Sequence, residues 1–184
     1  MSDLETLAAP AVEKLLLSGP DQLYEQLGLR RKAIEADPTQ AGHFDTLVTF
    51  NAPFAGPLDA LREFGQRFFE GVNSDVYGLV CGNDSAHATE RNKVLNAIGG
   101  GPTAFAATLA AVLVSTFGWA PALAAVVAAL VVKLFFKNAH AATCEVWRKH
   151  LPKPAKPTLA RGKRAATVKK KGGSGGRKRP KTKR

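Results

Sequence analysis

Apolar residues recur at helical spacing in several segments of the first hundred residues, and this pattern predicts a body of short amphipathic helices. The segments 1–19, 20–37, 57–72 and 83–98 each place apolar side chains three or four positions apart, with charged residues between them. Pro10 lies inside the first pattern, so either the helix begins at that proline or two helical turns meet there in a kink.

Two segments between these helices carry a weaker signal. Residues 42–57 contain strand-like side chains without clean alternation and end among prolines and a glycine, which fits an extended segment or a loop. Residues 73–82 are too short to classify, and we expect one or two helical turns beginning at Ser74. The predicted helical body covers residues 1–99, and the glycines at 99–101 act either as a hinge or as a helix stop.

Residues 102–132 form a stretch of 31 residues without a charged side chain. Gly118 and Pro121 interrupt it, because glycine favours the end of a helix and proline favours the first helical turn. We therefore predict a hairpin of two apolar helical arms, at 103–117 and 122–136. Both arms are apolar on nearly every face, which predicts burial on all sides, either in protein or in lipid.

The region 100–150 is predicted to contain this hairpin and a long second helix. Neither glycine nor proline occurs between the second arm and Pro152, so we expect that helix to run unbroken from Pro121 to about His150. A helix of this length would extend for ~45 Å, which is longer than a small domain needs. Its last third could lie on a membrane surface or pack on the body, and packing is the simpler expectation.

The length of the two arms does not show whether the hairpin is surrounded by protein or by lipid. Each arm reaches only ~22 Å, whereas a bilayer has a hydrocarbon core of ~30 Å. The second arm gains length if Lys133 extends its amine to the interface. A thin or tilted membrane hairpin and the buried centre of a soluble bundle therefore both remain open. The residues expected to contact lipid or core are Phe105, Leu109, Leu113, Phe117, Trp119, Leu123, Val127, Leu130 and Phe135.

The net charge of +11 is distributed unevenly along the chain. Residues 1–150 carry 12 basic and 15 acidic side chains, whereas residues 151–184, the basic tail, carry 14 basic and no acidic ones. The basic tail has almost nothing apolar to bury, so we predict that it is disordered alone and binds nucleic acid or anionic lipid without sequence specificity. The polyanion-binding residues are predicted to be Lys153, Lys156, Arg161, Lys163, Arg164, Lys169, Lys170, Lys171, Arg177, Lys178, Arg179, Lys181, Lys183 and Arg184.

Cysteine and histidine residues give no strong signal for a site. With only Cys81 and Cys144 and no signal-peptide pattern, we expect a reducing compartment and two unpaired cysteines buried as small apolar side chains. His140 and Cys144 are spaced to share one helix face, and Cys81 and His87 could complete a four-ligand zinc set. No CxxC or HExxH motif supports that set. We therefore predict no catalytic residue, no cofactor and no metal.

Together these features predict an all-α protein, for which two functions remain open. The leading interpretation is a non-enzymatic protein whose hairpin associates with the cytoplasmic membrane. Both chain ends would be cytosolic because of the flanking basic residues, and the basic tail would bind anionic lipid or nucleic acid. The alternative is a soluble cytoplasmic protein that binds nucleic acid through the basic tail and a protein partner through the body. The alanine-rich arms also permit a homo-oligomer.

Overall fold

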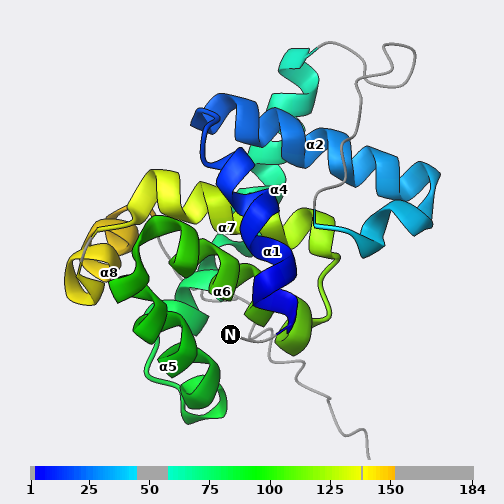
Figure 1. Ribbon diagram of the computed structural model, residues 1–184. Helices are drawn as coiled ribbons and strands as arrows, with labels where there is room; N and C mark the ends of the chain where they lie inside the picture. The colour runs from blue at the N-terminus through cyan, green and yellow to red at the C-terminus, as the bar shows by residue number, and fades with distance from the viewer. Residues whose placement is uncertain (1–2, 45–57, 138, 152–184) are drawn as a thin grey trace, which may run out of the picture. The chain divides into compact units, whose positions relative to one another are not determined.

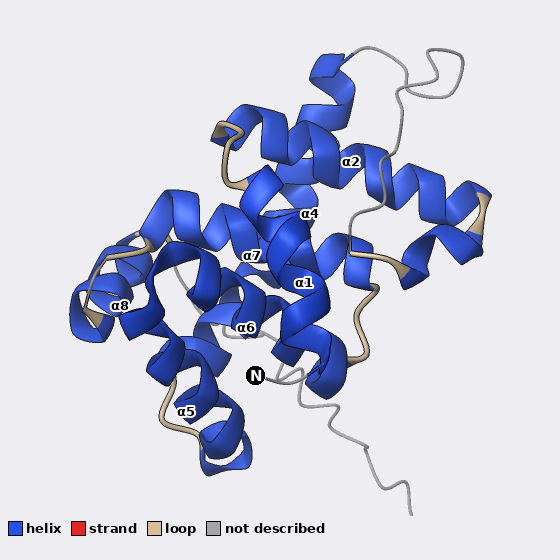
Figure 2. Cartoon of the chain, in the orientation of Figure 1, coloured by secondary structure: helices blue, strands red, loops and turns tan. Residues whose placement is uncertain are grey.

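The computed structural model describes residues 3–44, 58–137 and 139–151, and within these ranges the regular structure is entirely helical (Figure 2). The predicted all-α fold is confirmed. The chain divides into a helical unit, Met1–Pro152, and a second unit, Lys153–Arg184. The helices of the first unit are α1 Asp3–Leu15, α2 Pro20–Ala36, η1 Pro38–Gly42, α4 Leu58–Cys81, η2 Ser85–His87, α5 Ala88–Ala97, η3 Ile98–Gly100, α6 Gly101–Phe117, α7 Pro121–Phe135 and α8 His140–Lys149.

Local sequence signals explain most of the helix boundaries. Prolines occupy the first turns of α2, α6 and α7, where their missing N–H is not needed for an intrahelical hydrogen bond. Gly118 ends α6 in the left-handed conformation, with a φ of 65° that glycine adopts without strain. The Asp84 side chain accepts a hydrogen bond from the backbone of Ala86 and caps η2, as expected from the polar residues at this position. Pro10 lies inside α1, which continues through it.

Helix α4 is longer than predicted, because it continues past residue 72 to Cys81. Its buried positions Phe69, Asn73, Val76 and Val80 follow one another at intervals of three and four residues, so they form one face of a single helix. The polar Asn73 interrupts the apolar pattern in the sequence, although its side chain is buried like its neighbours. The expected separate turn at 73–82 is therefore wrong.

The second hairpin helix is shorter than predicted, because α7 ends at Phe135 and α8 begins at His140. Side-chain hydrogen bonds replace the missing glycine or proline at this break. The Thr143 hydroxyl accepts a hydrogen bond from the backbone nitrogen of Lys137 at 2.9 Å and lies 3.1 Å from the carbonyl oxygen of Ala139. A buried threonine thus satisfies backbone groups that the helix would otherwise have paired.

Helices α6 and α7 lie side by side at the centre of the helical unit, and other helices cover them (Figure 1). Helix α1 packs against both, α2 packs against α7, and α5 packs against α6. Helix α4 packs on α2 and α8 and also reaches α7, where Phe69 stacks on Phe135. The predicted hairpin is therefore the core around which the amphipathic helices are arranged.

The contact between α2 and α4 depends on two glycines. A Cβ atom placed on Gly28 would lie 2.4 Å from the carbonyl oxygen of Leu61, and one placed on Gly65 would lie 2.0 Å from that of Tyr24. Real carbon atoms do not approach backbone oxygens this closely, so neither position accepts a larger residue without separation of the helices. The sequence alone did not distinguish these glycines from the others in the chain.

Replacement of Gly65 by alanine is expected to lower the free energy of unfolding by about 1–3 kcal/mol, because the added methyl group must push α2 away from α4. Gly71 in the same helix has nothing within 4 Å of an added Cβ, so Gly71→Ala is the matched control. We expect Gly71→Ala to raise stability by about 0.5–1 kcal/mol through helix propensity. Urea unfolding followed by circular dichroism measures both. Equal effects of the two changes would contradict the close contact.

Candidate functional site

The apolar hairpin is enclosed by protein along most of its length. Every residue from Ala122 to Val131 on α7 is buried, as is every residue from Phe105 to Leu113 on α6. The covering side chains include Ala8, Val12 and Leu15 of α1. The apolar side chains of both arms are therefore covered by protein within the helical unit.

The hairpin residues singled out from the sequence fall into a buried group and an exposed tip. The buried group consists of Phe105, Leu109, Leu113, Leu123, Val127, Leu130 and Phe135. At the tip, Phe117 is 38% exposed and Trp119 is half-buried, and their ring centroids lie 6.4 Å apart. The ring of His87 also packs on Phe117, at 5.5 Å. The turn of the hairpin therefore presents aromatic side chains at the surface.

One described stretch has the length and hydropathy of a membrane span. It lies within the 33 residues from Ser85 to Phe117, where one segment of 18 residues has a mean hydropathy of 1.7 and is 50% buried. Helices α7 and α8 meet the same criteria of length and hydropathy only when they are taken together, and they are bent by 92°. A core helix of a soluble protein can have the same length and composition, so this feature does not separate the two environments.

Trp147 fastens α8 to the rest of the helical unit. Its buried indole nitrogen donates a hydrogen bond of 2.7 Å to the Oδ1 atom of Asn73 on α4. Its ring stacks on Phe135 at a centroid distance of 4.8 Å and meets the edge of Tyr77 at 5.8 Å. This contact explains why Asn73 is buried, because an indole N–H away from water requires an acceptor.

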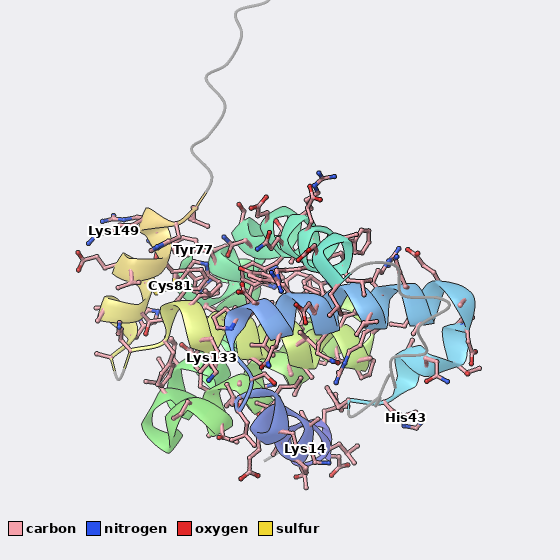
Figure 3. All side chains as sticks on the ribbon, turned by 90° about the horizontal axis from the view of Figure 1, so that it is seen from above. Lys14, His43, Tyr77, Cys81, Lys133 and Lys149 are labelled. Carbon is pink, nitrogen blue, oxygen red and sulfur yellow. A yellow bond between two sulfur atoms is a disulfide. The ribbon has the colours of Figure 1, made fainter. Side chains whose placement is uncertain are left out.

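A disulfide bond joins Cys81, the last residue of α4, to Cys144 on α8 (Figure 3). The two residues are 63 positions apart in the chain, but their Cα atoms lie 5.6 Å from each other. The prediction of two unpaired cysteines, buried as small apolar side chains, is therefore wrong, because they are paired and partly buried. The spacing in the sequence did not reveal that the end of α4 and the first turns of α8 would meet.

His140 lies next to the disulfide. Its Nε2 atom is 3.0 Å from the Sγ atom of Cys144, one helical turn away, and 3.1 Å from the carbonyl oxygen of Val80. Of the four residues considered for a metal set, the fold brings together Cys81, His140 and Cys144. It does not add His87, whose ring packs at the hairpin tip.

A shallow hollow of about 210 Å³ adjoins this cluster and is lined by Tyr77, Ala141, Cys144, Glu145 and Arg148. Lys149 donates a hydrogen bond of 3.0 Å to Glu145. This hydrogen bond and the positive charge of Lys149 lower the pKa of the Glu145 carboxyl. Glu145 is therefore ionised at neutral pH and contributes a carboxylate to the rim of the hollow.

The predicted polyanion-binding residues of the basic tail lie outside the described residues. Comparison with protein-family models, with curated proteins and with solved structures finds no match to this chain.

Loss of the disulfide is expected to lower the free energy of unfolding by about 4 kcal/mol. The chain-entropy model predicts this value for a bond that joins residues 63 positions apart. Urea unfolding with and without a reducing agent measures the effect. The double variant Cys81→Ser/Cys144→Ser is the control and should not respond to the reductant. An unfolding midpoint that is the same in both conditions would show that the bond does not form in solution.

Proposed function

We propose that this chain is a non-enzymatic, soluble nucleic-acid-binding protein. In this proposal the helical unit is a folded support, and the basic tail holds the polyanion. The observation that carries the proposal is the separation of charge: residues 151–184 carry 14 basic and no acidic side chains, whereas the preceding 150 residues carry 15 acidic and 12 basic ones. Lysine and arginine in such a segment bind phosphates and release counterions.

The basic residues of the helical unit support this division of roles, because many of them are already engaged within the unit. Arg91 donates hydrogen bonds to the carbonyl oxygens of Leu79 and Asp84, and buried Arg30 donates to those of Phe44 and Ala122. Other basic side chains form ion pairs with acidic neighbours, in the pairs Arg31–Glu35, Arg62–Glu25, Arg67–Glu63 and Lys149–Glu145.

The burial of the hairpin supports solubility. Side chains such as Leu109, Val127 and Leu130 are completely covered by protein, so their apolar surface is removed from water without a bilayer. Transfer of these helices to lipid would require the surrounding helices to separate from them. The contacts with the covering helices oppose that transfer.

Nucleic-acid binding is expected to weaken steeply with salt. If about six phosphates are neutralised, the logarithm of the binding constant should fall with the logarithm of salt concentration at a slope near −5. The measurement is the affinity for duplexes of unrelated sequence across a salt series, for the full chain and for a chain ending at Pro152. The shorter chain should lose most of the binding and remain helical.

A full chain with the basic residues of 177–184 changed to glutamine serves as an intermediate control. It retains the length of the chain but has fewer positive charges, so its salt slope should be shallower. Binding that survives truncation at Pro152, or that hardly changes with salt, would place the binding site on the helical unit.

Association with a membrane is the second candidate, favoured by the apolar part of the helical stretch Ser85–Phe117 and by the aromatic tip at Phe117 and Trp119. In this alternative the hairpin enters the bilayer and the basic tail contacts anionic headgroups. The chain ending at Pro152 distinguishes the candidates, because it keeps the hairpin and lacks the basic tail. We expect a single species in buffer without detergent. Recovery only in detergent, or flotation with neutral vesicles, would favour the membrane candidate.

A further inference from the structure

Three side chains with metal-binding atoms meet where α4 ends and α8 begins. His140 and Cys144 are four residues apart and share one face of α8, and Cys81 approaches from the last position of α4. The Nε2 atom of His140 and the two Sγ atoms all lie within 4.8 Å of one another. All three residues are partly buried, so the cluster has access to solvent and support from the two helices.

We propose that Cys81, His140 and Cys144 form a Zn²⁺ site when the disulfide is reduced. Two thiolates and an imidazole are ligands that favour Zn²⁺ over Mg²⁺ or Ca²⁺, which prefer oxygen atoms. A tetrahedral zinc ion with Zn–S distances of about 2.3 Å separates its sulfur atoms by about 3.8 Å. Once the S–S bond is broken, rotation of the Cys81 side chain at the end of α4 and of the Cys144 side chain within α8 allows this separation.

Three protein ligands leave one zinc coordination position for another group. The hollow beside Cys144, with Tyr77 and Glu145 on its rim, gives water access to the cluster. Water is therefore the expected fourth ligand, as in zinc sites that keep an open position. In the disulfide form the Nε2–H group of His140 donates to the carbonyl oxygen of Val80. Zinc binding replaces this hydrogen bond and leaves the imidazole proton on Nδ1.

The disulfide and the metal site exclude each other, because the same sulfur atoms serve both. A dithiol reductant breaks the S–S bond and supplies two electrons and two protons, and it is itself oxidised to a disulfide. Zn²⁺ then displaces one proton from each cysteine thiol as it binds. Reduction thus exchanges a covalent link between α4 and α8 for a link through the metal.

The test is Zn²⁺ binding by the full chain in competition with a chromophoric chelator. It is done with and without a phosphine reductant, which breaks the S–S bond and is itself oxidised to the phosphine oxide. We expect one Zn²⁺ per reduced chain and none per oxidised chain. Reduced His140→Ala should bind at least about tenfold more weakly, since removal even of an outer-shell partner costs that much. His87→Ala is the matched control and should bind as the unaltered chain does. Co²⁺ bound to the reduced chain should give the intense visible absorption of a tetrahedral thiolate site.

Two further measurements show whether a loss of Zn²⁺ binding comes from the missing ligand or from unfolding of the variant. Circular dichroism of oxidised His140→Ala should match that of the unaltered chain, since the disulfide is still present. Zn²⁺ should raise the thermal midpoint of the reduced unaltered chain and not that of Cys81→Ser/Cys144→Ser. Equal Zn²⁺ affinity in the reduced unaltered chain and this double variant would overturn the proposal. Unchanged affinity in folded His140→Ala, or a loss in His87→Ala equal to that in His140→Ala, would also overturn it.

Discussion

The structure of the helical unit depends on one constraint, the burial of the apolar hairpin formed by α6 and α7. Helix α7 is buried at every position from Ala122 to Val131, so it requires neighbours on all sides. The other hairpin helix, α6, provides some of them, and the covering helices α1 and α2 provide others, each with an apolar face turned inward. The covering helices are amphipathic for the same reason, because one face meets the hairpin and the other meets water. Helix α4 meets α2 closely at Gly28 and Gly65 and contributes Phe69 to the same core.

Buried polar groups determine the position of α8 and the break between α7 and α8, which apolar packing alone does not specify. Asn73 accepts the indole hydrogen bond of Trp147 and thereby fixes the position of α8 against α4. Thr143 satisfies the backbone at the break between α7 and α8. Each of these polar side chains is buried and has a partner, which is the condition under which polar groups are tolerated in a core. The C-terminal part of the helical unit is thus fastened by specific pairs as well as by apolar contacts.

The local pattern predicted the helices and the hairpin, because helical spacing, Gly118 and Pro121 act over a few residues. It did not predict that α4 would continue past Asn73. A buried asparagine in an apolar helix face requires a hydrogen-bond partner, and that partner, Trp147, is distant in the sequence. The break before His140 also lacks a local signal, because Thr143 creates it from within the following helix. The pairing of Cys81 with Cys144 depends on a contact between distant segments, and such contacts are not encoded in spacing. The role of the basic tail remains a prediction from charge alone.

The Cys81–Cys144 bond also gives the molecule a covalent ring. The ring contains every residue from 81 to 144 and therefore all of α5, α6 and α7. A protease that cut the peptide chain once anywhere within this ring would leave the two products joined through sulfur. The cut would open the ring, yet the fragment that carries α4 and the fragment that carries α8 would stay joined until a reductant broke the disulfide.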